Sequence, residues 1–353
     1  MAVQPQGCTP AVYCRPRPAE TPLYRAVQNH LETFLALCRD DWEDKRIAPH
    51  AERERRRFLE CGILAYGVAR AHCTECGHDF LVAFSSKGRP VCPSCGTRRM
   101  AETAAHLVDH VLPPLPVRQG VLSLPKRLRY HLQHDREAIH CALRIFLDEI
   151  ERHLRAQSPG AVAFIPRFGS SLNVHTHFHV CAIDGVFASD PHGGVRFIEA
   201  REMDACHAEA MQTKVRVRIL RAFVRRGLID QDERKAMASW DHGGGFSLDA
   251  TLHITAHDRH GLERLLHYCA RPAFAAERLR ELDAHRLIYP LPKPAPDGRT
   301  QLILSPLELI ERIAALVPPP RVHRHRYYGV LAPNASLRAA VTAMAPEAID
   351  IMF

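Results

Sequence analysis

Apolar residues in the first part of the chain recur at the spacing of an α-helix, beginning directly after Thr21-Pro22. Threonine is a favourable N-cap and proline a favourable first helical residue, so this dipeptide indicates where the helix begins. The apolar face consists of Leu23, Val27, Leu31, Phe34, Leu35 and Cys38. We expect this helix to end near the acidic residues of 40–44. Residues 51–59 predict a short second helix, whose arginine run either faces solvent or contacts DNA.

Three further segments complete the N-terminal part. Residues 1–20 hold four prolines and little periodicity, which predicts a flexible tail. Residues 70–100 combine turns, short strands and four clustered cysteines, and residues 101–112 predict a helix. Pro113-Pro114 ends that helix, because proline cannot continue it, and marks the expected end of a domain over residues 21–113.

The second half alternates between strand-like and helix-like periodicity. Strands are predicted near 117–124, 161–165, 174–187, 195–198 and 251–255. Helices are predicted near 136–156, 199–227, 258–270 and 307–316, and residues 286–304 predict a hairpin. This order favours an α+β fold in which helices pack on a sheet. We expect this second domain to cover residues 114–317 and a C-terminal extension to follow over 318–353.

Composition excludes some classes of protein and favours others. The 353 residues are 46% hydrophobic and 24% charged, which is ordinary for a globular protein and argues against a mostly disordered chain. No apolar run approaches the ~18–20 residues of a membrane span, and the N-terminus has no apolar segment typical of a secretory signal. By default we expect no membrane partner and a cytoplasmic, bacterial location.

The formal net charge of +8 rests mainly on arginine, since only six of the 47 basic residues are lysine. A GC-rich genome explains part of that bias. Guanidinium groups also match phosphate oxygens in two-point contacts, so a basic chain of this size suggests a polyanionic partner, most often nucleic acid.

The cysteines form one pattern with a clear chemical meaning. Cys73, Cys76, Cys92 and Cys95 are spaced as C-x2-C-x15-C-x2-C, and each pair is followed by glycine. Two such pairs complete a tetrahedral all-sulfur site for structural zinc, and that closed site leaves no position for substrate. The other eight of the twelve cysteines are expected to be core or surface thiols, because no export signal favours disulfides.

A second pattern places histidines at every other position of a predicted strand. His175, His177 and His179 would then share one face, about 6.7 Å apart in succession, while Phe178 faces the core. Two or three imidazoles at that spacing can bind one divalent cation, which activates water or polarises a phosphodiester. A solvent-facing strand that carries histidine by chance is the alternative.

A candidate nucleophile lies on the predicted helix 258–270. Tyr268 is at the edge of that helix's apolar stripe, with Arg264 and Arg271 beside it on the polar side. Its oxygen can attack a phosphate that the two guanidinium groups hold. The residues alone favour the alternative that Tyr268 is a packing residue with a hydrogen-bonded hydroxyl.

Together and in this order, the three features resemble the rolling-circle transposases of the insertion-sequence-ninety-one family, and most of all its relatives in insertion sequence common region elements. The resemblance extends from about residue 20 to about residue 335. The matching stretches are 58–113, 117–132, 167–187 and 264–272.

The resemblance implies an N-terminal four-cysteine zinc module followed by an HUH nuclease, named for its His-hydrophobe-His motif, with a ferredoxin-like antiparallel sheet. His177-Phe178-His179 would be that motif and would hold Mg²⁺ or Mn²⁺, and Tyr268 would be the nucleophile. The implied reaction joins a DNA 5′-phosphate to the tyrosine and leaves a free 3′-OH. The implied substrate is single-stranded or melted DNA at the element ends.

Two departures from related proteins matter. Founding members carry a second tyrosine where this chain has Arg264, so the chain resembles a single-tyrosine subgroup. Other single-tyrosine HUH transposases place a glutamine four residues after the tyrosine, where this chain has Pro272. The third metal ligand must come from elsewhere, and His175 and His253 both stay open.

Further basic residues are candidates for DNA contact. Arg98 and Arg99 follow the second cysteine pair, and Lys126, Arg127 and Arg129 follow a predicted strand. A solvated surface explains Arg98 and Arg99 nearly as well. Three other functions remain as alternatives: a zinc-dependent DNA-binding regulator or decayed transposase, a metal hydrolase with a water nucleophile, and a non-enzymatic zinc scaffold. The sequence leaves open whether the chain forms homo-oligomers.

Overall fold

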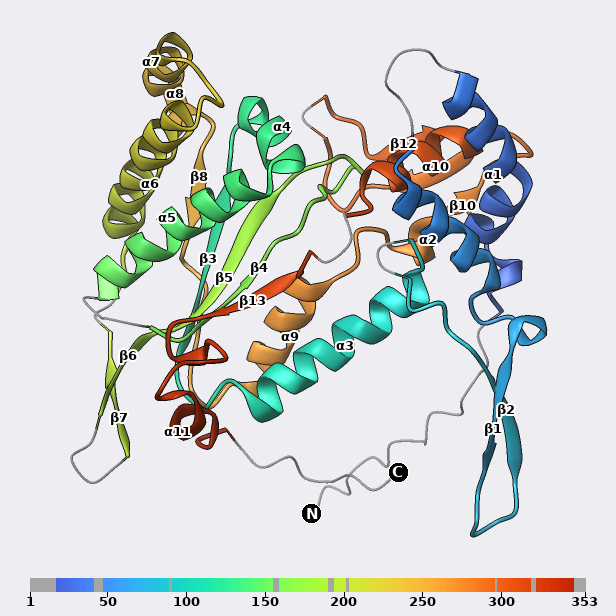
Figure 1. Cartoon of the computed structure of the whole chain (residues 1–353), viewed down its shortest axis with the longest axis horizontal. Coiled ribbons are helices and arrows are strands. Elements are labelled where there is room, and N and C mark those ends of the chain that lie inside the picture. Colours follow the sequence, from blue (N-terminus) through green and yellow to red (C-terminus); the bar gives the residue numbers. More distant parts are fainter. Residues whose placement is uncertain are drawn as a thin grey trace, which may run out of the picture.

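The computed structural model describes most of the chain (Figure 1). The described residues are 17–40, 47–88, 91–154, 159–189, 194–200, 203–295, 297–318 and 322–345. The predicted tail, residues 1–20, lies outside them except for a short 3-10 helix, Pro18–Glu20. No helix within these ranges is both long enough and apolar enough to span a bilayer.

A six-stranded antiparallel sheet forms the centre of the molecule, in the order β13-β4-β5-β3-β8, with β9 also paired to β3. The strands are β3 (Val117–Ser123), β4 (Ala161–Phe164), β5 (His177–Ile183), β8 (Ser247–Asp249), β9 (His253–Ile254) and β13 (His325–Tyr328). The α+β prediction is confirmed in this coarse form. β5 has every residue buried because it lies between β4 and β3 and both of its faces are covered.

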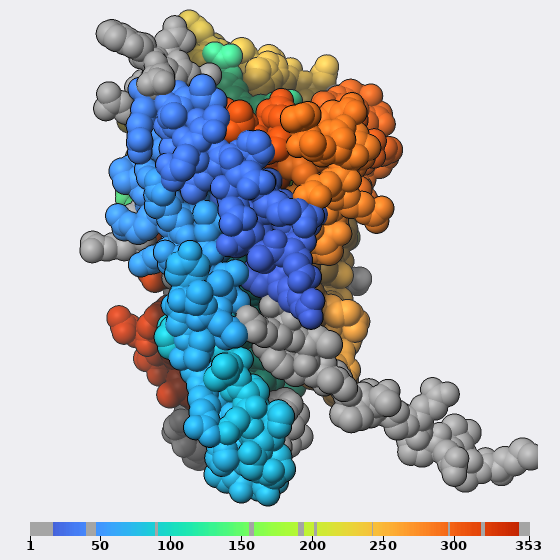
Figure 2. All heavy atoms as spheres, turned by 90° about the vertical axis from the view of Figure 1, so that its right-hand side faces the viewer, coloured from blue at the N-terminus to red at the C-terminus, as the bar shows by residue number. Residues whose placement is uncertain are grey.

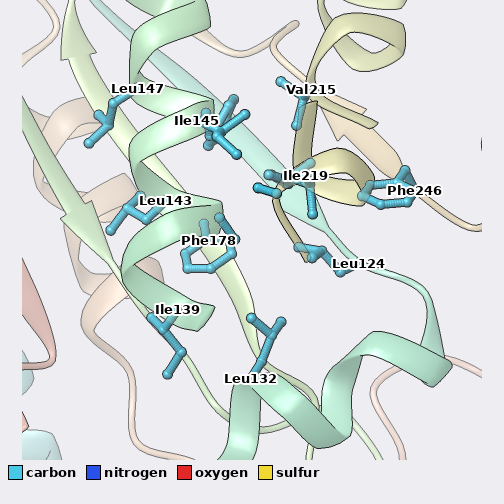
Figure 3. Close-up of a cluster of buried hydrophobic side chains, with 14 of the residues drawn as sticks. Leu124, Leu132, Ile139, Leu143, Ile145, Leu147, Phe178, Val215, Ile219 and Phe246 are labelled. Carbon is cyan, nitrogen blue, oxygen red and sulfur yellow. The ribbon is translucent and has the colours of Figure 1, made fainter. Parts of the chain in front are cut away.

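Helices cover both faces of this sheet (Figure 1). One face packs against α5 (Arg136–Leu154) and α6 (Ala205–Arg225), and the other against α3 (Pro93–His110) and α9 (Arg259–Ala270). Figure 3 shows the first core, in which Phe178 of β5 lies among apolar side chains of α5 and α6. The second core joins α3 and α9 to the opposite face of the same strands.

A third core joins two segments that are far apart in the sequence. It consists of residues from α1 (Pro22–Asp40), α2 (Pro49–Glu60), β11 (Leu287–Pro290), β12 (Gln301–Leu304) and α10 (Pro306–Ala315), and the exposed strand β10 (Arg280–Glu281) pairs with β11. Figure 2 shows these N-terminal and late segments, blue and orange, forming one continuous surface. The predicted regions 21–113 and 114–317 therefore share a core, and β13, from the predicted extension 318–353, lies at the edge of the central sheet.

The remaining elements extend from these cores. Two hairpins project from them: β1 (Val68–His72) with β2 (Asp79–Ala83), and β6 (Gly185–Ser189) with β7 (Val195–Glu199). The other helices are α4 (Lys126–His134), α7 (Gln231–Ser239), α8 (Asp241–Gly244) and α11 (Arg338–Thr342), with short 3-10 turns at Leu64–Tyr66, Ala276–Arg278 and Gly329–Leu331.

Arg55 is buried, although the arginine run of the second helix was predicted to face solvent or DNA. Its side chain is 1% exposed and donates hydrogen bonds to the carbonyls of Ala51 and Ile310, so it ties α2 to α10. Burial lowers its pKa to about 10. Solvent exposure does hold for its neighbours Arg53 and Arg57.

Two predicted boundaries also shift. The long strand predicted over 174–187 is divided at Asp184 into β5 and β6, because the chain turns there to form the β6–β7 hairpin. The helix predicted from residue 101 begins at Pro93 instead, since proline fits the first helical turn.

Candidate functional site

His177 and His179 lie side by side on the central strand. Antiparallel pairing of β5 with β3 places His177 opposite Ser123 and His179 opposite Val121. Both side chains are buried on the face that α9 covers, whereas Phe178 faces the core with α5 and α6. The alternation predicted from the sequence is confirmed for these three residues, because a strand points successive side chains to opposite faces.

His175 does not belong to the strand. It precedes β5, and its backbone N–H donates to the carbonyl of Arg167 in a neighbouring loop. Its ring centroid is nevertheless 5.0 Å from that of His177, which is in turn 4.9 Å from that of His179. The three imidazoles therefore form a row, and the Nε2 atom of His175 is buried without a hydrogen-bond partner.

The electrostatic surroundings keep these imidazoles neutral. Burial lowers the pKa of all three, to about 3 for His179 and to about 4 for His175. The guanidinium groups of Arg271 and Arg129 act in the same direction on neighbouring rings. A neutral imidazole is the form that binds a metal ion, so the row fits a divalent cation chemically.

Hydrogen bonds fix which ring nitrogens face outward. Nδ1 of His177 lies 3.0 Å from the carbonyl oxygen of His175, so it donates there and leaves Nε2 free to accept a metal ion. On His179, Nδ1 lies 2.9 Å from the side-chain amide of Gln119, which also contacts the sulfur of Cys269 at 3.2 Å. The amide nitrogen of Gln119 faces Nδ1 and donates to it, so in the neutral His179 ring the proton lies on Nε2, and binding a metal ion there requires that proton to move.

Gln119 is a site residue that sequence reasoning missed. It is buried on β3 and lies on the same face as His179. A single glutamine among the apolar residues of a predicted strand was the available signal, since a buried amide needs hydrogen-bond partners.

Close grouping of ligand atoms does not identify a third metal ligand. Among the described residues, the three imidazoles do not bring their ligand nitrogens within 4.8 Å of one another as a group. His175 stays a prediction. The strand register excludes His253. It pairs with Arg118, which lies about 17 Å along β3 from Ser123, the partner of His177. Its Nε2 instead lies 3.4 Å from Asp184.

Tyr268 lies beside this row. The apolar stripe of α9 packs on the sheet and leaves Tyr268 48% exposed at its edge. Its ring meets the ring of His179 edge-on, with 5.6 Å between centroids. The Arg271 guanidinium lies over the tyrosine ring, 4.3 Å from its centroid, and Arg264 is exposed one turn earlier on the helix. The fold thus brings together Tyr268, Arg271 and the histidine row.

A separate group of thiols forms where α2 ends and α3 begins. Cys61, Cys92 and Cys95 bring their sulfur atoms within 4.8 Å of one another, and Cys61 lies 3.5 Å from each of the other two. Thiolates around tetrahedral zinc lie about 3.8 Å apart, given a Zn–S bond of about 2.3 Å, so the group fits zinc. Contacts with Cys61 and Cys92 lower the pKa of Cys95, which favours its thiolate.

The predicted partners Cys73 and Cys76 lie elsewhere. They occupy the turn of the β1–β2 hairpin, where the backbone N–H of Gly77 donates to the carbonyl of Cys73, and they are not members of the thiol group. The paired strands carry this turn about 13 Å from the hairpin base. The structure thus gathers three thiols, of which Cys61 was expected to be an ordinary core or surface thiol, and Cys73 and Cys76 stay predicted ligands.

The sequence did contain a signal for Cys61. It is followed directly by Gly62, just as Cys76 is followed by Gly77, and both glycines have positive φ, +77° and +70°. Glycine adopts that conformation without strain, so a Cys-Gly pair marks a tight turn around a sulfur ligand.

The basic residues predicted for DNA contact have varied surroundings. Arg98 pairs with Glu102 and Arg127 with Glu233, while Arg129 donates to the carbonyl of Leu124. Lys126 is exposed at the start of α4. Arg99 lines a cavity next to the tyrosine helix.

Comparison with known families gives two matches. Residues 160–338, just over half of the chain, match the family model "Putative transposase", and residues 26–124 match the model "Transposase zinc-binding domain". No curated protein and no solved structure matches the chain. The first match contains the histidine row and Tyr268, and the second contains the thiol group.

Proposed function

The chain belongs to the insertion-sequence-ninety-one family of transposases, with a zinc-binding domain in its N-terminal third, and from this premise we propose the reaction that it catalyses. It cleaves and rejoins single DNA strands at the ends of a mobile element, through a covalent link between Tyr268 and a 5′-phosphate. The observation that supports this most directly is the contact of the exposed Tyr268 ring with the buried ring of His179.

The cleavage step balances with these residues. The phenolic oxygen of Tyr268 attacks the scissile phosphorus in line, and the bond from phosphorus to the 3′-oxygen breaks. The phenol loses one proton and the departing 3′-oxygen gains one. The phosphodiester energy stays in the phosphotyrosine bond, so a free 3′-OH can later reverse the step and rejoin a strand without ATP.

Each side chain has a distinct part in this scheme. His177 and His179 would hold a divalent cation, Mg²⁺ or Mn²⁺, which when bound polarises the scissile phosphate. Arg271 lies over the Tyr268 ring, where its guanidinium can contact the phosphate that the tyrosine attacks. Gln119 positions His179 through its Nδ1 atom.

The substrate is single-stranded or melted DNA. Tyr268 extends from a helix that packs on the sheet, with its hydroxyl at the helix edge. A phosphate in a stacked duplex reaches such a position only after distortion, which costs a few kcal/mol per unstacked step.

Zinc at the thiol group, by contrast, stabilises the N-terminal domain.

Covalent capture tests the proposal. Protein, Mn²⁺ and labelled single strands from the DNA that flanks the gene are incubated and separated on a denaturing gel. We expect a protein–DNA adduct with the wild type and with Tyr66→Phe, which changes another exposed tyrosine in the N-terminal region, and none with Tyr268→Phe.

The other outcomes identify the alternatives. An adduct that survives Tyr268→Phe moves the nucleophile to another residue. Cleavage without any adduct indicates a hydrolase that uses water. DNA binding without metal-dependent cleavage indicates a regulator or a decayed transposase.

A further inference from the structure

A cavity of about 600 Å³ opens beside the C-terminal end of α9. Its walls come from α3, from the junction of α4 and α5, from the loop after β4 and from the segment that leads into β13. The arginines that line it are Arg99, Arg136, Arg167, Arg271, Arg324 and Arg326. Phe164 and Phe168 also line the cavity but are buried, 2% and 7% exposed.

The cavity carries a large excess of positive charge. No acidic residue is found among the described residues that line it. Arg167 is half-buried and donates to the carbonyls of Leu132 and Gln133, and burial lowers its pKa. Cations gathered in a partly enclosed space repel one another, so an anion bound there is stabilised.

Arg271 connects this cavity with the tyrosine site. Its guanidinium lies 4.3 Å from the ring centroid of Tyr268 and 5.7 Å from that of Phe168. One side chain therefore borders both places.

We propose that the cavity binds the nucleotide adjacent to the scissile phosphate, with its phosphate against the arginines. The inference rests on the proposed function and names the part of the strand that this site holds. Guanidinium groups pair with phosphate oxygens in two-point contacts, so a cavity lined by six arginines has the chemistry to bind a nucleotide phosphate. The volume lies in the range of small-ligand sites, ~300–1,000 Å³, and excludes a duplex.

A second basic groove on the opposite face of the sheet serves as a control. It is lined by Arg218, Arg221, Arg225 and Arg234 on α6 and α7. Arg218 already pairs with Asp148 and Glu149, so part of this charge is neutralised within the protein. The groove also lacks aromatic lining among the residues that the structure describes there.

The test compares two matched double variants of the full chain. Arg99→Glu with Arg326→Glu changes the cavity without touching Tyr268, and Arg221→Glu with Arg225→Glu changes the second groove. The probe is a fluorescein-labelled oligothymidylate of about 20 nucleotides, long enough to cover one single-strand site, followed by anisotropy. We expect the Kd to rise about tenfold or more for the cavity variant and less than about threefold for the groove variant.

Salt dependence of the Kd and photochemical crosslinking give two further tests of the proposed binding site. The slope of log Kd against log salt should fall by about 0.7 for each phosphate that the cavity variant no longer neutralises. A probe that contains 5-iododeoxyuridine should crosslink to the peptide that holds Phe164 and Phe168. Equal weakening of binding in both variants, or crosslinks only outside the cavity, would overturn the inference.

Folding and the reaction itself are controlled separately. Should charge reversal lower the unfolding temperature, Arg99→Gln with Arg326→Gln replaces it. An adduct at Tyr268 together with an unchanged Kd in the cavity variants refutes the proposed binding of the nucleotide in the cavity but not the proposed reaction. A cavity-dependent Kd without any adduct in the wild type refutes the proposed reaction and leaves the binding site standing.

Discussion

The thiol group and the histidine row gather potential metal ligands in opposite ways. Cys61, Cys92 and Cys95 converge, with all sulfur atoms within 4.8 Å of one another. The histidines stand in sequence along the chain, and the row continues to Tyr268, which is open to solvent. A convergent group closes around an ion and stabilises a fold, whereas a row that ends at an exposed hydroxyl leaves room for a substrate.

The surroundings of the thiol group and of the histidine row also differ. The thiols join the end of α2 to the start of α3, beside the core shared with α10. His177 and His179 lie on the central strand between two cores, next to an arginine-lined cavity, and His175 precedes that strand. One region is expected to determine stability and the other reactivity, and four changes test that division.

His179→Ala should have the largest effect. Removing one of the two strand imidazoles is expected to cost about 4 kcal/mol of transition-state stabilisation, or about 10³-fold in the rate of adduct formation. His253→Ala, at the other end of β3, is the matched control and should leave the rate unchanged. Rates are measured under single-turnover conditions with Mn²⁺. Similar rate decreases for both variants would remove the distinction between the two histidines.

Cys61→Ser should abolish zinc binding and destabilise the N-terminal domain. Bound zinc falls from about one ion per chain to almost none, because only two of the three gathered thiols remain as ligands. Cys73→Ser, at the hairpin turn, should retain the metal. Zinc content and thermal unfolding measure both variants. Loss of zinc in Cys73→Ser to the same degree would restore the four-cysteine set.

Arg55→Ala should destabilise the same region by a smaller amount. The change leaves the carbonyl of Ile310 without its buried donor and opens a cavity between α2 and α10, at a cost of about 2–4 kcal/mol. Arg57→Ala, on the exposed side of the same helix, should cost less than about 0.5 kcal/mol. Denaturant unfolding compares the two, and equal costs would contradict the buried role of Arg55.

Gln119→Ala should have the smallest effect, confined to the histidine row. Removing the hydrogen-bond partner of Nδ1 of His179 is expected to weaken Mn²⁺ affinity and activity about 10- to 100-fold. Gln119→Glu, which replaces the amide by an acceptor, should restore most of the affinity, because an acceptor at Nδ1 of His179 holds the ring proton there and leaves Nε2 unprotonated. Calorimetric titration with Mn²⁺ measures the affinity, and an unchanged Kd in Gln119→Ala would assign the residue a packing role only.

Local patterns were sufficient for much of the fold. Periodic apolar faces located α1, α5, α9 and α10, because helix burial repeats every 3.6 residues. Period-2 alternation located β3 and β5 and separated His177 and His179 from Phe178. The motif spacing located His177 with His179 and Cys92 with Cys95. The structure brings Tyr268 to the histidine pair.

What the sequence did not reveal depends on partners distant in the chain. Gln119 and His179 are neighbours because two strands pair in one register, and Cys61 meets Cys92 because α2 ends where α3 begins. Arg55 is buried only because α10, some 250 residues later, covers it. No local pattern encodes such contacts.

By itself, the sequence determined the types of element, the alternation along β5 and the chemistry of each candidate ligand. Tertiary packing alone decided which cysteines share a site, that Tyr268 faces His179, and that six arginines surround one cavity. The reason is physical: periodicity reflects which face of an element is buried, whereas a site depends on which buried faces meet.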